Sequence, residues 1–139
     1  MEIIAVAEQT VATNQNVLFT DSVTNGNCSI THRDGSGLVT LRGNTAQCRA
    51  RYKVSFGGNI AIPTGGTAGA ISVALSIDGE PVAASTMTVT PLDLNEYHNV
   101  FGAMFIDVPK GCCLTISVQN INDQSILVQN ANLIVERVA

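Results

Sequence analysis

The clearest pattern in the chain is an alternation of apolar and polar side chains in residues 70–90, which read AISVALSIDGEPVAASTMTVT. Every second residue from Ile71 to Ile77 is large and apolar, and alternate residues of a strand point to the same face. Asp78-Gly79 follows, a dipeptide that tolerates the positive φ of a tight hairpin turn. The residues after it are small or β-branched, as suits a returning strand. The segment is therefore predicted to be a β-hairpin with one buried face.

A second stretch, residues 47–56, alternates just as regularly. One set of its positions is apolar or aromatic, and the other set is basic at Arg49, Arg51 and Lys53. The pattern predicts a strand with one face in the core and a basic stripe on the other. Gly57-Gly58 predicts that the strand ends there and that a loop follows, continuing through residues 63–67.

Residues 96–108 fit two interpretations. Asp93 followed by Glu96 has the spacing of a helix N-cap with its capping-box partner. Against a helix, residues such as Phe105 and Val108 suit a strand, and Gly102 in mid-segment weakens helical structure. The second observation favours a strand, and the helix remains the alternative.

Shorter apolar or alternating runs, separated by turn residues, fill the rest of the chain. They lie at residues 2–11, 17–19, 28–33, 38–41, 114–119 and 126–138. Together these segments make about ten short strands. They predict an all-β sandwich or barrel that forms a single domain over residues 1–139.

Composition changes this picture by indicating a covered surface. Charged residues make up 13% of the chain and hydrophobic residues 45%, whereas an average soluble protein has about 25% charged residues. We therefore expect another subunit to cover part of the surface. The net charge of −4, with no Trp and only four Phe and two Tyr, argues against nucleic acid as a partner, because phosphates need clustered Lys and Arg and bases stack on aromatic rings.

The first residues, MEIIAVAEQTVA, differ from a secretory signal, because they have no basic start and their apolar run is broken at Glu8. No run approaches the ~20 apolar residues of a membrane span. We therefore expect a chain that is made in the cytoplasm and has no membrane partner.

Four cysteines are expected to be small core residues rather than a disulfide framework. They are Cys28, Cys48, Cys112 and Cys113. Cys112 and Cys113 are adjacent, so they lack the two-residue spacing of zinc knuckles and thioredoxin-like sites. A bridge between Cys28 and Cys48 remains the alternative.

Three segments, ISVALSIDGEPV, GCCLTISVQN and NANLIVERV, resemble strands of the compact jelly rolls in the tumour-necrosis-factor and complement-globular-head superfamily. The chain is most similar to the bacterial and phage branch, with its spore-surface collagen-like glycoprotein heads and Firmicutes prophage proteins. The resemblance covers nearly the whole chain. It implies a ten-stranded antiparallel jelly roll that assembles as a tight homotrimer, with the C-terminal strand in the inner sheet.

For function, the resemblance implies a protein that is not an enzyme. The spore-surface and complement proteins are displayed on collagen-like stalks, and these residues show neither signal nor stalk. We therefore expect a phage or prophage structural protein of the virion, either a head-decoration protein or the head of a fibre. Its further partner would be a phage capsid or a host-surface glycan. A carbohydrate-binding adhesin, or a spore- or cell-surface protein of the same fold, is the alternative.

The basic stripe of Arg49, Arg51 and Lys53 is the candidate binding site. It could bind anionic glycans or dock on an acidic capsid surface. The simpler interpretation is that these side chains pair with Glu136, with Asp107 or with carboxylates of a neighbouring subunit, or are solvated. Of these, we favour pairing between subunits.

No residue set predicts a catalytic site, a metal site or a cofactor. Ser36 lies in a DGSG turn and not in a nucleophile elbow, and His32 and His98 have no ligand partners on their own strands. The glycine-rich IPTGGTAGA lacks the Lys and Ser or Thr of a phosphate loop, and is expected to be an end loop where partners bind. A metal held around a three-fold axis by Asp93, Glu96 or His98, or a cupin-like metal enzyme, is least favoured.

Overall fold

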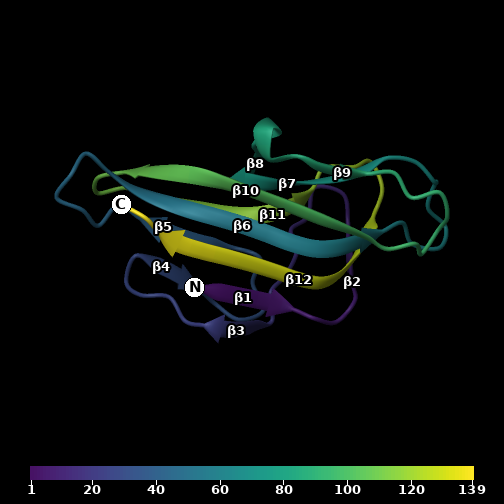
Figure 1. Ribbon diagram of the computed structural model, residues 1–139, viewed down its shortest axis with the longest axis horizontal. Coiled ribbons are helices and arrows are strands. Elements are labelled where there is room, and N and C mark those ends of the chain that lie inside the picture. Colours follow the sequence, from purple (N-terminus) through teal and green to yellow (C-terminus); the bar gives the residue numbers. More distant parts are fainter.

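The computed structural model describes residues 1–139 and contains twelve β-strands and one three-residue 3-10 helix, η1 (Ala83–Ser85) (Figure 1). The strands are β1 (Glu2–Ala5), β2 (Gln9–Val11), β3 (Asp21–Thr24), β4 (Ile30–His32), β5 (Val39–Arg42), β6 (Arg49–Ala61), β7 (Ile71–Ile77), β8 (Glu80–Pro81), β9 (Met87–Val89), β10 (His98–Pro109), β11 (Cys113–Asn120) and β12 (Ile126–Arg137). No helix is long and apolar enough to cross a membrane.

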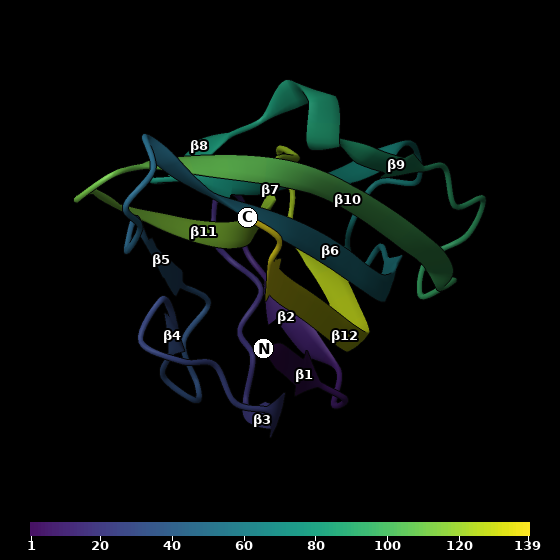
Figure 2. The same ribbon diagram turned by 60° about the vertical axis from the view of Figure 1, so that its left-hand side comes forward.

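The strands form two antiparallel sheets that pack face to face (Figure 2). Sheet A has the order β10-β6-β12-β1-β3, and sheet B has the order β4-β5-β11-β7-β8. β2 continues β1 along β12, and β9 continues β8 along β7, so each sheet has five strand positions. The predicted ten-stranded sandwich is confirmed, with two of its strands each interrupted once.

The interruption between β1 and β2 divides the strand that was predicted over residues 2–11. Opposite this break, the register of β12 on β6 shifts between Gln129 and Asn132. Asn130 takes a positive φ of 54° there, and its N–H donates to the carbonyl of Val6 at 3.2 Å. Asn tolerates this left-handed backbone better than most residues, so β12 can bulge and then resume pairing.

The predicted hairpin is confirmed between β7 and the pair β8 and β9. Asp78 and Gly79 have φ values of 51° and 86°, as a tight turn between twisted strands requires. η1 interrupts the returning strand between β8 and β9. The side chain of Ser85 replaces the backbone pairing with β7 that is lost there. The hydroxyl of Ser85 accepts from the N–H of Leu75 at 2.9 Å and donates to the carbonyl of Val82 at 2.7 Å.

The predicted loop at Gly57-Gly58 is wrong, because β6 continues without a break to Ala61. Gly58 serves close packing instead of a turn. A Cβ on Gly58 would lie 3.2 Å from the ring of Phe56 and 3.4 Å from the Cα of Ala131, which is tighter than ordinary contact. Glycine in a strand can mark close approach as well as a bend.

Residues 98–109 form strand β10, which confirms the strand interpretation of this segment. The capping-box contact is nevertheless present, because the N–H of Asp93 donates to Glu96 at 3.1 Å. This contact closes a turn and no helix follows, since β10 pairs with β6 along its whole length. At Gly102, a Cβ would lie 3.0 Å from the side chain of Met87, so the glycine admits that side chain.

The strand predicted at residues 17–19 is not formed, although Val17 and Phe19 are fully buried. Their N–H groups donate to Val118 at 2.8 Å and to Ser36 at 3.2 Å. Because these partners lie on two different segments, the stretch carries apolar side chains into the core without a continuous ladder.

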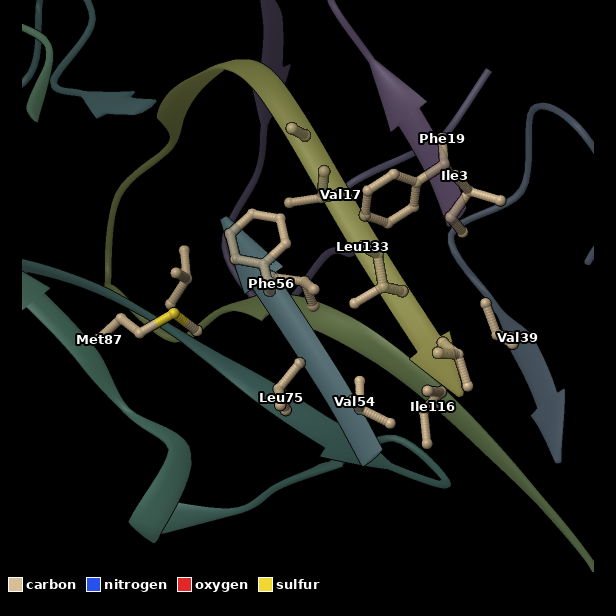
Figure 3. Close-up of a cluster of buried hydrophobic side chains, with 14 of the residues drawn as sticks. Ile3, Val17, Phe19, Val39, Val54, Phe56, Leu75, Met87, Ile116 and Leu133 are labelled. Atoms are coloured by element: carbon tan, nitrogen blue, oxygen red, sulfur yellow. The ribbon is translucent and has the colours of Figure 1, made fainter. Parts of the chain in front are cut away.

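The core lies between the two sheets and is a cluster of 28 buried residues (Figure 3). The rings of Phe19 and Phe56 meet edge to face, with centroids 6.4 Å apart. Sheet A contributes side chains such as Val54 and Leu133, and sheet B contributes Leu75 and Ile116. Alternate residues of each long strand therefore point inward, as the hydrophobic pattern predicted.

The expectation of buried cysteines is wrong, because all four are exposed and none forms a disulfide. They lie at or just outside the ends of strands: Cys28 precedes β4, Cys48 precedes β6, and Cys112 and Cys113 are at the start of β11. Cys48 lies one residue before β6 and continues its alternation, but it is exposed. The alternating pattern therefore predicted a core position for Cys48, although this residue lies outside the strand.

Candidate functional site

The outer face of sheet A, which points away from the core, carries large apolar side chains in contact with solvent. Phe101 is 68% exposed, Phe105 is 61% exposed and Ile134 is 42% exposed. We call these three residues the apolar strip. In the register of β10 and β12 on β6, Phe101 lies beside Gly57, and Ile134 lies beside Ser55. Small residues of β6 therefore lie between the larger apolar side chains of β10 and those of β12.

The predicted basic stripe lies on this same outer face, at one end of the apolar strip. Arg51 holds Asp107 of β10 with both arms of its guanidinium group, from Nε to Oδ1 at 2.8 Å and from Nη2 to Oδ2 at 3.1 Å. Arg49 Nε lies 3.2 Å from Oδ2 of the same carboxylate. Lys53 has Phe105 and Glu136 as cross-strand neighbours. Asp107 was one of the partners that the sequence offered, and here the pairing is within the chain.

These contacts fix the charge state of the stripe. The hydrogen bond from Arg51, together with the charges of Arg51 and Arg49, lowers the pKa of Asp107, and the same bond raises the pKa of Arg51. One carboxylate serves two guanidinium groups, so this cluster keeps one positive charge at neutral pH. It borders a hollow of about 260 Å³ that is lined by Gln47, Cys48, Arg49, Arg51 and Ala139.

The two candidate histidines, His32 and His98, are not brought together. The side chain of His32 is buried, and its Nε2 lies 2.8 Å from the carbonyl of Ser36, whereas His98 Nε2 pairs with Glu96 at 3.0 Å. His32 is on sheet B and His98 is on sheet A. No three His, Cys, Asp or Glu side chains are placed to hold a metal ion.

The glycine-rich loop of residues 62–70 connects β6 to β7 at one end of the sandwich, as its composition predicted. Sequence reasoning missed the side chain that holds this loop, which is Gln124. The only signal was the cluster of amide residues in QNINDQ, residues 119–124. Such a cluster marks a turn, but it does not reveal a partner 57 residues away in the sequence.

No family model matches the sequence, and no curated protein matches it. The structure is similar to the globular domain of the zebrafish complement 1qA protein, with a TM-score of 0.64 and 14% identity over 96% of this chain and 93% of that chain. It is similar to murine APRIL at pH 8.5, with a TM-score of 0.64 and 10% identity over 97% of both chains. For murine APRIL at pH 5.0 the TM-score is 0.55, with 10% identity over 95% of both chains.

These likenesses define the class of fold. The chain is an all-β, antiparallel jelly-roll sandwich of the tumour-necrosis-factor and complement C1q type. Because these proteins are only 10% to 14% identical to this chain, the likeness establishes the fold and does not identify a ligand. The function is therefore argued from the surfaces of this molecule.

Proposed function

We propose that this protein is a non-enzymatic homotrimeric structural module, and that it assembles through the outer face of sheet A. The observation that carries the proposal is the apolar strip of Phe101, Phe105 and Ile134 on that face. Burying an aromatic side chain of this size contributes roughly 2 kcal/mol. The low charge content of the chain supports a covered surface in general, because a face covered by other copies needs few charges.

The basic stripe fits the edge of such an interface. Arg49, Arg51 and Asp107 together carry one excess positive charge, and their side chains are 40% to 57% exposed. In the proposed trimer, a carboxylate of the neighbouring copy would face this excess, which makes the stripe an inter-subunit salt-bridge face. An anion bound at the stripe is the alternative, and the 260 Å³ hollow beside it would accommodate one.

We further propose that the trimer is a component of a phage or prophage virion, either as head decoration or as the head of a fibre. The sandwich would supply rigidity, and its end loops would meet a capsid or a host surface. No cofactor and no nucleic acid take part in this function. A carbohydrate-binding adhesin, or a spore- or cell-surface protein of the same fold, is the second candidate, favoured by the polar hollows between the end loops.

Light scattering of the purified chain, at several concentrations and with a reducing agent present, tests the assembly. The expected mass is three times that of the chain, independent of concentration. A monomer at all concentrations would contradict the trimer. Mass spectrometry of particles purified after prophage induction, beside purified spores and cell envelopes, tests the location. The chain is expected in the particles, and its confinement to spores or envelopes would favour the second candidate.

A further inference from the structure

Three loops meet at the end of the sandwich opposite to the C-terminus (Figure 1). They are residues 62–70 between β6 and β7, residues 90–97 between β9 and β10, and residues 121–125 between β11 and β12. Seven of the nine residues in the first loop are Gly, Ala or Thr, so this loop carries few bulky side chains. The end is therefore open to a ligand along the backbone itself.

Side-chain amides hold these loops in place. Gln124 Oε1 accepts from the N–H of Thr67 at 2.9 Å, and Gln124 Nε2 donates to the carbonyl of Thr67 at 2.9 Å. Asn95 joins the second loop to the first, because its Nδ2 donates to Thr64 Oγ1 at 2.9 Å and its N–H donates to the carbonyl of Ile62 at 2.7 Å. A loop that is ordered before binding loses less conformational entropy when a ligand arrives.

Two hollows flank the clamp made by Gln124 and Thr67, and both of these residues line both hollows. The first hollow, of about 380 Å³, is lined by residues 63–67, Gln124 and Ser125, and the second, of about 370 Å³, is lined by residues 67–70, Asp123 and Gln124. Each has the volume of a small-molecule site. Gly65 and Gly69 have positive φ values of 92° and 156°, and a Cβ added at either would meet no atom within 4 Å. Gly65 lines the first hollow and Gly69 lines the second.

We propose that this pair of hollows binds a neutral glycan, an inference that rests on the proposed role of the end loops in meeting a host surface. The lining offers what sugar hydroxyl groups recognise: the Asp123 carboxylate as an acceptor, the hydroxyl groups of Thr64 and Ser125, and open peptide groups at the glycines. No Lys or Arg lines either hollow, and the single charged side chain is Asp123. An acidic sugar would find no counter-charge there and would be repelled by that carboxylate.

The test is a glycan array that carries neutral and acidic glycans, probed with the labelled full chain. Ala68 is exposed in the second hollow, so A68W fills that hollow, and D123A removes the acceptor. We expect the wild-type chain to be retained by a neutral glycan, and both variants to lose retention at least tenfold. The matched control is A46W, which adds the same bulk at an exposed alanine outside both hollows, and it should bind like the wild type.

Two results would overturn the inference. One is the absence of any retained neutral glycan, or retention that A68W and D123A leave unchanged. The other is retention of acidic glycans alone, lost when Arg49 and Arg51 are changed to Ala, because the ligand would then lie at the basic stripe. Light scattering of the same preparation separates the two proposals. A trimer that binds no glycan refutes this inference alone, and a monomer that binds a neutral glycan refutes only the trimer.

Discussion

The outer faces of the two sheets differ although the strands beneath them follow the same alternation. Every large exposed hydrophobic side chain that lies in a strand belongs to sheet A, where Val23 joins the three residues of the apolar strip. The strands of sheet B carry hydroxyl groups outward instead. Thr31, Thr40 and Thr115 are direct neighbours in a row across β4, β5 and β11. The core faces of the strands build the sandwich, and the outer face of sheet A is the one that the proposed trimer would cover.

The first prediction concerns a charge placed on the outer face of each sheet. Phe105→Asp on sheet A would remove the ring from the proposed trimer interface and bury a charged carboxylate there beside Lys53, which costs about 4 kcal/mol and weakens association about a thousandfold. Light scattering should then show a monomer. Thr88→Asp is the matched change at an exposed position of β9 in sheet B, and it should leave the mass unchanged. If Phe105→Asp keeps the wild-type mass, the apolar strip is not the interface.

The second prediction compares two phenylalanines on opposite faces of sheet A. Phe56 is fully buried in the core and Phe101 is 68% exposed. In the Phe105→Asp background, where unfolding is not coupled to association, Phe56→Ala should lower the free energy of unfolding by about 3–5 kcal/mol. Phe101→Ala should change it by less than about 0.5 kcal/mol. Urea unfolding measures both, and a large loss for Phe101→Ala would mean that this ring stabilises the monomer itself.

The third and smallest effect is electrostatic. The pKa of Asp107 in sheet A is lowered by hydrogen bonding and charge from Arg51, whereas that of Asp78 is lowered by hydrogen bonds from the N–H and hydroxyl of Thr115. A carboxyl group with a lowered folded-state pKa stabilises the fold above its unfolded pKa of about 3.9. That contribution is lost as the pH falls from about 4 through the folded pKa.

Salt separates the two carboxyl groups, because it screens exposed ion pairs more than hydrogen bonds between neighbouring groups. Carboxyl carbon NMR titrations at low salt and at about 1 M salt, where the screening length is about 3 Å, should show the pKa of Asp107 rising toward its ordinary value. The pKa of Asp78 should stay low. If salt changed both pKa values equally, Arg51 would lower the pKa of Asp107 through its two hydrogen bonds alone.

Much of the fold could be predicted from the sequence because period-two alternation is a local signal. It located β7 and most of β6, and the Asp78-Gly79 turn set the hairpin. Gly58 was misread because glycine appears both at chain reversals and where another segment packs closely, and only the contact with Phe56 distinguishes the two. The cysteines were misread because alternation gives the direction of a side chain and not the point where the sandwich ends.

The candidate sites were less predictable because they join distant segments. The stripe of Arg49, Arg51 and Lys53 was visible as a pattern on one strand, and its partner Asp107 was among the offered carboxylates. The clamp between Gln124 and Thr67 had no local signal. The outward position of Phe101 and Phe105 was also hidden, since an apolar residue on a strand can face the core or the outside, and only the register on β6 decides.

The position of β12 has a consequence for how the protein forms during synthesis. β12 is the last strand in the sequence, yet it lies in the middle of sheet A between β6 and β1, where Glu2 is paired with Ile134. Sheet A therefore cannot close until β12 has left the ribosome, whereas the strands of sheet B are all made before it. Such non-local pairing folds slowly and leaves strand edges exposed meanwhile. Newly made chains would thus be most prone to misassembly in the interval before β12 inserts.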